Sequence, residues 1–358
     1  MRESHSQRVK RLAENFRREQ ERRATLSLAE RDREDAFWRS PAPERSPVPV
    51  PLDWVQPVVG DLQFQTLAVG GEATDKPVQW HHSDGGWFSF LHVQNVAVTH
   101  TGANSATMHA LFERLKPAAS GNAQRLRLTL GAQAERRLNA GLTGIDDGVT
   151  PSVAQLLPPG PYMVTLTTLQ PVRVQPGDTN DFLSREVVEF WGEAESAGLR
   201  NEQLYFRSPG WREGTTITYM GGTAMDAVDV GICLLVPTQA DNRLNPERVA
   251  HYVRAIGRGQ TPTVFTLQVL EERDSNSTSG SDPVLGNLAL SIHHVLDGHH
   301  KLHAAAISGS TVTALTFTAL GLMHSHRQDQ FRNQLHRHQT LLVRWDARAR
   351  GKDLPIVP

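Results

Sequence analysis

The sequence is poor in the features that define several protein classes. It has one cysteine, Cys233, so an internal disulfide cannot form and a disulfide-stabilised secreted scaffold is excluded. Cys233 lies in an apolar run and is interpreted as a small hydrophobic core residue. The longest apolar-leaning segments, near residues 228–237 and 314–323, have about ten residues, half of a membrane span. The first 35 residues are charged throughout, without the apolar stretch of a signal peptide. We therefore expect no membrane partner and no secretion through a signal peptide.

Motifs that name a reaction are also missing. The chain has no G-x-x-x-x-G-K-[ST] phosphate loop, no G-x-G-x-x-G, no G-x-S-x-G, no H-E-x-x-H and no C-x-x-C. Its net charge of −1 is not that of a general binder of polyanions. We predict a protein that is not an enzyme, with no catalytic set, no metal and no cofactor.

Charged residues of both signs dominate the N-terminal end. Residues 1–45 carry 12 basic and 9 acidic side chains, mixed at helical spacing, and three apolar residues recur at i, i+3 and i+7. A capping-box pattern at Ser27 begins a second short helix that ends near Trp38. We predict a helical arm over residues 1–39, which needs a partner surface because isolated helices are marginal. The predicted assembly contacts are Val9, Leu12, Phe16, Arg17, Arg18, Arg22, Arg23, Phe37 and Trp38.

Nucleic acid is a secondary partner of this arm. The stretch from Arg8 to Arg23 has seven basic and three acidic residues, and Arg8, Lys10 and Arg11 are the predicted contacts. Affinity for nucleic acid grows with the number of phosphates neutralised, and the interleaved glutamates oppose it. The pattern favours packing of the arm against protein.

Four segments follow from composition: the arm (1–39), a proline-rich spacer (40–51), a β-rich body (52–323) and a basic C-terminal tail (324–358). Within the body, runs rich in Thr, Val and Leu and bounded by turn residues predict strands. They lie at 87–93, 96–99, 125–130, 162–174, 215–219, 228–236, 263–270 and 311–322, with short helices at 107–115, 132–139 and 246–256. The predicted fold is mainly β, with a β-sandwich or jelly-roll-like body.

Histidine is concentrated near the C-terminus, where nine of sixteen follow residue 290. His299 and His303 would share a helix face, and His324 and His326 a strand face. Imidazoles at such spacing suit zinc, nickel or copper, but no familiar carboxylate arrangement accompanies them. The alternatives are loop and interface hydrogen bonds, or a pH-sensitive interface, since clustered histidines gain charge near pH 6. The remaining members of the cluster are His293, His294, His300, His336 and His338.

The plan of arm, spacer and Thr/Val-rich β body resembles coat and surface proteins of small non-enveloped viruses. The resemblance implies a capsid or capsid-surface subunit, located in the virion or host cytoplasm, with copies of itself or another shell protein as partners. Basic ends and a middle of net charge −8 over residues 46–323 agree with contacts between subunits. Two other interpretations stay open. One is a metal-dependent β-barrel enzyme that uses the C-terminal histidines. The other is a carbohydrate- or receptor-binding module with Trp80, Trp87, Trp191 and Trp211 as stacking anchors.

Overall fold

The computed structural model describes eight stretches of the chain, together with Thr25 and Ser27. They are residues 62–103, 110–114, 130–173, 206–207, 231–239, 244–273, 288–320 and 328–352, with short gaps at 63, 73–74, 83–87, 95 and 146–147. The proline-rich spacer and almost all of the predicted arm lie outside the described residues, as do the strands predicted at 125–129 and 215–219.

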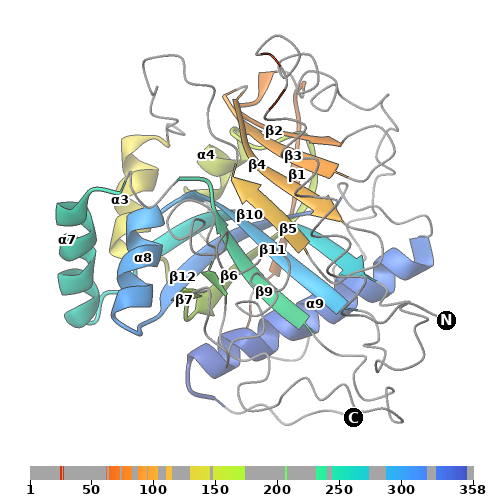
Figure 1. Cartoon of the computed structure of the whole chain (residues 1–358). Coiled ribbons are helices and arrows are strands. Elements are labelled where there is room, and N and C mark those ends of the chain that lie inside the picture. The colour runs from red at the N-terminus through yellow and green to blue at the C-terminus, as the bar shows by residue number, and fades with distance from the viewer. Residues whose placement is uncertain are drawn as a thin grey trace.

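A mixed eight-stranded sheet lies at the centre of the molecule (Figure 1). The strand pairs β10–β12 and β9–β11 are parallel, and the other neighbouring pairs are antiparallel. In order across the sheet the strands are β1 (Phe64–Val69), β6 (Gly160–Leu169), β12 (Val312–Ala319), β10 (Thr263–Arg273), β11 (Leu288–Asp297), β9 (Gly231–Pro237), β8 (Phe206–Arg207) and β7 (Val172–Arg173). The strands predicted at 228–236, 263–270 and 311–322 are confirmed over their described residues, whereas the segment predicted as one strand at 162–174 forms two strands, β6 and β7, which lie at different places in the sheet.

A second, antiparallel sheet has four strands in chain order: β2 (Val78–His82), β3 (Phe88–Val93), β4 (Val96–Ala103) and β5 (Ala110–Arg114). The predicted pair at 87–93 and 96–99 is confirmed as β3 and β4. The helix predicted at 107–115 is wrong, because residues 110–114 form the edge strand β5. A single short helical segment is marginal by itself, and pairing with β4 supplies hydrogen bonds that decide its conformation.

Among the described residues, five helices flank the sheets: α3 (Ala132–Ala140), α4 (Thr150–Ala154), α7 (Pro246–Gly257), α8 (His299–Ile307) and α9 (Gln328–Ala349). The helices predicted at 132–139 and 246–256 are confirmed as α3 and α7. Residues 328–349, within the predicted tail, form the 22-residue helix α9, which runs along the large sheet (Figure 1).

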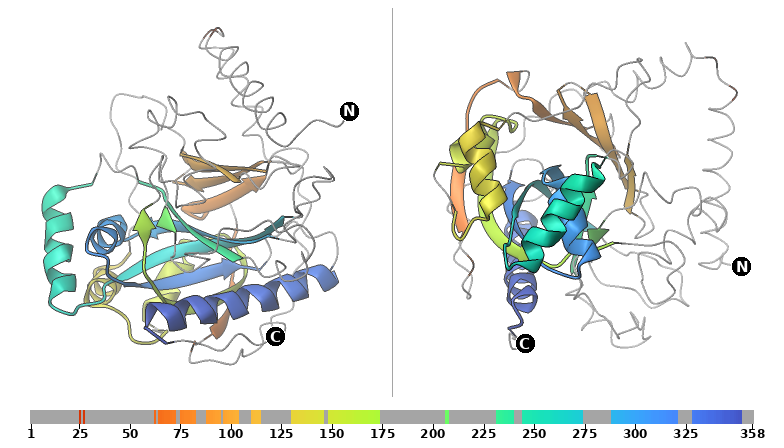
Figure 2. Two further views of the ribbon diagram at one scale, coloured as in Figure 1. Left: turned by 60° about the horizontal axis from the view of Figure 1, so that its bottom comes forward. Right: turned by 90° about the vertical axis from the view of Figure 1, so that its left-hand side faces the viewer.

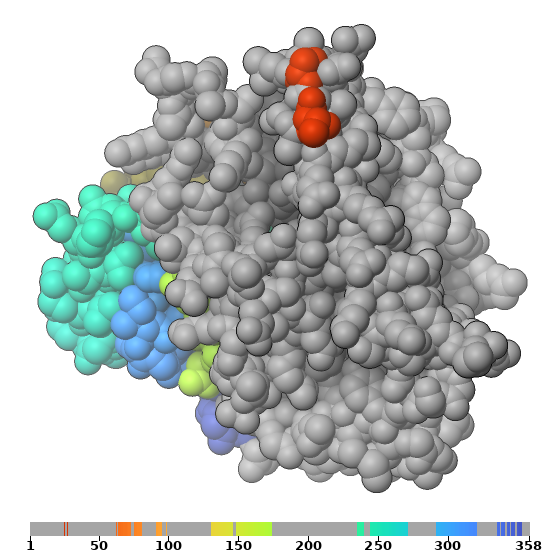
Figure 3. Space-filling view, viewed as in Figure 1, coloured from red at the N-terminus to blue at the C-terminus, as the bar shows by residue number. Residues whose placement is uncertain are grey.

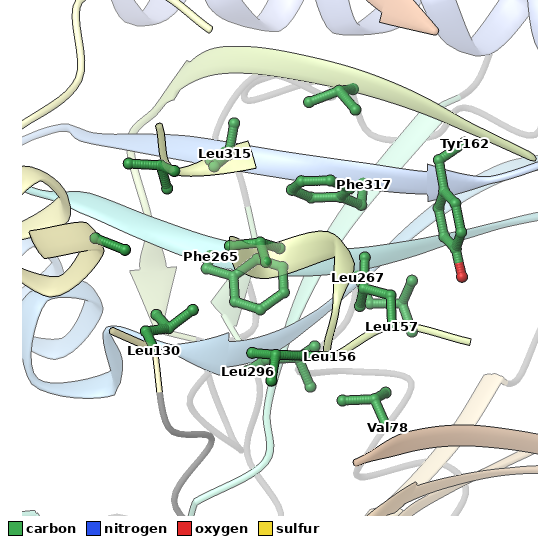
Figure 4. Packing of buried hydrophobic residues seen from close by; sticks show 14 of the residues in the cluster. Val78, Leu130, Leu156, Leu157, Tyr162, Phe265, Leu267, Leu296, Leu315 and Phe317 are labelled. Carbon is green, nitrogen blue, oxygen red and sulfur yellow. The ribbon is translucent and has the colours of Figure 1, made fainter. Parts of the chain in front are cut away.

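Apolar side chains cover both faces of the large sheet. On one face the small sheet contributes Leu91 and Val98 to a core shared with Phe265 and Phe317, whose ring centroids are 5.7 Å apart (Figure 4). On the opposite face α9 packs through residues such as Leu342 (Figure 2). A sheet that is covered on both sides buries every residue of its central strands, and β12 is buried along its whole length.

The C-terminal part of α9 is joined to β6 by a buried carboxylate. Asp346 Oδ1 accepts a hydrogen bond from the backbone N–H of Thr168 at 2.6 Å. Arg350 Nε lies 2.9 Å from the other carboxylate oxygen, Asp346 Oδ2. Asp346 therefore accepts the hydrogen bond of a strand N–H group, and Arg350, four residues later, neutralises its charge.

The described part of the chain is thus mainly β, with two sheets and a few helices. A sandwich or jelly roll stays a prediction, and the parallel pairs are a feature that an antiparallel jelly roll does not require. In the predicted arm Thr25 is helical and Ser27 is not, and its other residues lie outside the described ranges.

Candidate functional site

The turn from β11 into α8 depends on a glycine. Gly298 has φ 94° and ψ 20°, the left-handed region that residues with a Cβ rarely adopt. A Cβ at Gly298 would lie 2.9 Å from Val264 Cγ1 and 3.0 Å from Val264 Cα. Only glycine lets α8 begin directly at the end of β11 while β10 passes this closely.

Two helix N-termini meet beside this turn. The strands β9 and β11 are parallel neighbours, with Pro237 paired to Val295, so their carboxyl ends lie at the same edge of the sheet. The chain continues from β9 into α7 and from β11 into α8, and these two helices lie side by side at the molecular surface (Figure 3). In sheets with parallel strands, ligands bind outside the carboxyl ends of the strands, next to helix N-termini.

The two N-termini differ in how they are capped. Asn245 caps α7, because its Oδ1 accepts hydrogen bonds from the backbone N–H groups of Glu247 (2.9 Å) and Arg248 (3.1 Å). The N-cap of α8 is Gly298, and within the described part of the chain no side chain caps this helix. The N-cap residue of α8 therefore supplies no side-chain acceptor to the first turn, whose backbone N–H groups carry a partial positive charge.

Consecutive histidines tie the first turn of α8 to its surroundings. His299 Nε2 accepts hydrogen bonds from the backbone N–H groups of Thr238 and Gln239, each at 3.1 Å. His300 Nε2 accepts one from the N–H of Asn245 at 3.0 Å. The chain leaving β9 and the cap of α7 are both fastened to α8 in this way.

Lys301 places a buried cation at the same helix end. Its side chain is 3% exposed, and Nζ donates to the carbonyl oxygen of Thr263 at 2.8 Å. Nζ also lies 5.9 Å from the centroid of the Tyr252 ring, a cation–π distance. Burial lowers the pKa of Lys301 to about 8, with an opposing contribution from Asp297. Among the described residues Lys301 forms no ion pair, so its charge lacks a carboxylate in contact.

We name these residues the α7–α8 junction: Thr238, Gln239, Asn245, Arg248, Asp297, Gly298, His299, His300 and Lys301. Its charged members are Arg248, Lys301 and Asp297, and Glu247 on the first turn of α7 adds a second carboxylate beside them. Burial, followed by the charge of Arg248, lowers the pKa of His300, and Asp297 acts in the opposite direction.

A second polar cluster lies under α9, on the face of the large sheet that α9 covers. Its six members are fully buried and joined by hydrogen bonds across β10, β11 and β12, and we name them the polar layer: Thr266, Gln268, Ser291, His293, Thr316 and Thr318. His293 Nδ1 lies 3.3 Å from Thr266 Oγ1, and Nε2 lies 3.4 Å from Ser291 Oγ. Burial, followed by the neighbouring His294 and His338, lowers the pKa of His293 to about 3. Such a network orders the sheet–helix interface but is closed to solvent.

His294 follows His293 directly and points to the other face of the sheet. There it meets the Trp80 ring edge-on, with centroids 5.2 Å apart, and burial lowers its pKa to about 3. Strand geometry therefore separates two histidines that are adjacent in sequence. Across the described ranges, no three His, Cys, Asp or Glu side chains gather as a metal ion would need. His324 and His326 lie outside those ranges.

The predicted arm contacts are not placed by the structure. Val9, Leu12, Phe16, Arg17, Arg18, Arg22, Arg23, Phe37 and Trp38 lie outside the described residues, as do Arg8, Lys10 and Arg11. Of the four candidate tryptophan anchors, Trp80 is on β2 and packs against the core between the sheets, and Trp87, Trp191 and Trp211 lie outside. In the part of the chain that the structure covers, no helix is long and apolar enough to cross a bilayer.

Sequence reasoning singled out the histidines but missed Gly298, Lys301 and Arg248 as members of one site. The available signal was the glycine directly before His299-His300-Lys301, at the end of an apolar run. No family model, curated protein or solved structure matches this chain. Function must therefore be argued from the geometry of the junction.

Proposed function

We propose that the α7–α8 junction binds a small phosphorylated ligand. One observation carries the proposal: the N-terminus of α8, whose N-cap is a glycine without a side-chain acceptor, lies next to Lys301, a buried cation with no carboxylate in contact among the described residues. Backbone N–H groups at a helix start attract anions, and a buried charge without a counter-ion is stabilised when an anion reaches it.

Phosphate suits this environment better than a carboxylate. It carries a charge of about −1.5 to −2 at pH 7 and three strong acceptor oxygens, enough to engage several donors at once. Arg248, exposed on the first turn of α7, adds a planar donor group that matches phosphate oxygens. Asp297 repels an anion, so the balance rests on the basic groups and the backbone N–H groups around it.

Isothermal titration calorimetry with inorganic pyrophosphate tests this proposal, with citrate as the carboxylate arm at equal ionic strength. We expect pyrophosphate to bind more tightly than citrate. The substitution Lys301→Met should weaken pyrophosphate binding about tenfold or more, since a hydrogen-bonded charge contributes about 1.5–3 kcal/mol. Lys352→Met, which removes the same charge from an exposed lysine, is the matched control and should bind as the unchanged protein does.

Absence of pyrophosphate binding would refute the proposal, as would a folded Lys301→Met variant that binds as tightly as the unchanged protein. Tighter binding of citrate than of pyrophosphate would indicate a site for carboxylates and would contradict a phosphorylated ligand. Far-ultraviolet circular dichroism establishes that each variant is folded before its affinity is compared.

We further propose the assembly role that the sequence predicts, as a capsid or capsid-surface subunit with a sandwich-like body and a helical arm. The charge distribution favours it, because basic ends flank a middle of net charge −8. Light scattering of the full chain and of a chain lacking residues 1–45 tests this role. A large assembly that becomes a folded monomer on truncation supports it, and equal masses for the two chains contradict it. Ligand binding and assembly are compatible in one protein.

A further inference from the structure

His299 and His300 use the same ring atom in the same way. Each Nε2 faces backbone N–H groups, from Thr238 and Gln239 for His299 and from Asn245 for His300, at 3.0–3.1 Å. Backbone N–H groups can only donate, so both Nε2 atoms must carry a lone pair. Each imidazole is therefore neutral, with its proton on Nδ1.

Protonation reverses the role of these atoms. A proton added to Nε2 replaces the acceptor by a donor that faces other donors at hydrogen-bond distance. His299 loses two backbone hydrogen bonds in this way and His300 loses one. Protonation of the two rings thus breaks the hydrogen bonds that join α8 to both ends of the connection between β9 and α7.

The charges around His300 come from three elements. Arg248 on α7 and His303 on α8 oppose its protonation, whereas Asp297 at the end of β11 favours it. His299 Nε2 also lies 3.1 Å from the hydroxyl oxygen of Thr238. That hydroxyl has a second partner, the carbonyl oxygen of Val295 at 2.7 Å, so it can turn away from the ring.

We infer that His299 and His300 form a pH-sensitive clamp, which holds the first turn of α8 to the end of β9 and to the cap of α7 when both rings are neutral, and which opens on acidification. The clamp is a property of the fold and is independent of whether the junction binds an anion. The sequence suggested a pH-sensitive interface for the clustered histidines, and the clamp assigns such sensitivity to His299 and His300 within one chain.

Amide hydrogen exchange of the full chain at pH 7 and pH 5 tests the clamp, with rates corrected for intrinsic exchange. We expect protection of the Gln239 and Asn245 amides to fall at least tenfold at pH 5. The Thr238 amide also donates to the carbonyl oxygen of Val295 at 3.4 Å, so its protection should fall less. The amide of Thr313, which donates to the Pro262 carbonyl oxygen at 3.2 Å, reports on the body and should keep its protection.

The double variant His299→Gln, His300→Gln separates titration from loss of contact, because a glutamine oxygen accepts a hydrogen bond at both pH values. We expect the Gln239 and Asn245 amides of this variant to keep equal protection at pH 7 and pH 5. His336→Gln, at an exposed position on α9, is the matched control and should respond to pH as the unchanged protein does.

Two outcomes overturn the clamp: protection of these amides that is equal at pH 7 and pH 5 in the unchanged protein, or the same acid-induced loss in the double glutamine variant. Imidazole nitrogen NMR shifts of the unchanged protein give a second measurement that needs no variant. They should show unprotonated Nε2 atoms at pH 7, and protonated Nε2 at either residue at pH 7 would refute the inference.

Discussion

Replacement of Lys301 by methionine should make the stability of this protein less dependent on alkaline pH. The lysine is buried against Thr263 and Tyr252, and methionine has a similar length without a charge. Burial lowers the pKa of Lys301 from 10.5 to about 8. The folded state therefore releases the lysine proton at a lower pH than the unfolded chain does.

The sign of the effect follows from proton linkage. Between pH 8 and pH 10.5 the unfolded chain binds more protons at this site, so the stability of the unchanged protein rises with pH in this window. A lowering of about 2.5 pKa units corresponds to about 3 kcal/mol of destabilisation at neutral pH, where Lys301 is charged in both states. About 2.5 kcal/mol of this is recovered between pH 7 and pH 10.

The assay is urea unfolding of the two proteins in phosphate-free buffer at several pH values from 7 to 10. We expect the Lys301→Met variant to be the more stable at pH 7, because a buried charge gives way to an apolar side chain. The difference in unfolding free energy should shrink by about 2.5 kcal/mol by pH 10. Groups other than Lys301 titrate in both proteins and cancel in the difference.

If the difference in unfolding free energy between the two proteins stayed constant from pH 7 to pH 10, Lys301 would titrate alike in the folded and unfolded states. That result would contradict the lowered pKa of Lys301. Pyrophosphate supplies a second check on the unchanged protein. Bound at the junction, it should raise the pKa of Lys301, so its affinity should fall as the pH rises through about 8. Lys301→Met should abolish that fall.

Three further substitutions test the packing around the site. The pKa of His293 is lowered to about 3, so acidification from pH 6.5 towards 3 should destabilise the unchanged protein by up to about 5 kcal/mol. In urea unfolding, the stability of the His293→Gln variant should depend less on acidic pH than that of the unchanged protein. The control His336→Gln, at an exposed position, should lose as much stability in acid as the unchanged protein. Equal acid sensitivity of all three proteins would contradict this. Gly298→Ala should cost about 3 kcal/mol in the same assay, through its positive φ and the contact with β10, and a cost below about 1 kcal/mol would contradict the turn geometry. Asp346→Ala should cost about 2 kcal/mol by leaving the N–H of Thr168 without its acceptor, and a neutral result would show that another group satisfies it.

Local pattern was sufficient for about half of the described elements, and it did not predict β1, β8, β11, α4 or α9. The sequence Asn245-Pro246-Glu247 carries a cap, a first-turn proline and an acidic residue, and α7 begins there. Alternating Thr, Val and Leu marked β6, β10 and β12. Pattern failed at β5, where pairing with β4 overrides a helical tendency.

The candidate site was only partly accessible to the same reasoning. The concentration of histidines after residue 290 drew notice to α8, but metal-ligand spacing was the wrong guide to what these side chains do. His299 contacts Thr238 across 61 residues of chain, and the parallel pairing of β9 with β11 is what makes that contact. No local pattern encodes a partner at that separation.

Composition and neighbours a few residues away determined the absence of an internal disulfide, the mixed charge of the N-terminal segment and the position of about half of the described strands. Tertiary structure alone decided that His293 and His294 are both buried, that the start of α8 meets the start of α7, and that Lys301 is a buried cation. The physical reason is that burial and strand order are set by contacts between distant segments. These contacts decide which polar groups lose water and which partners replace it.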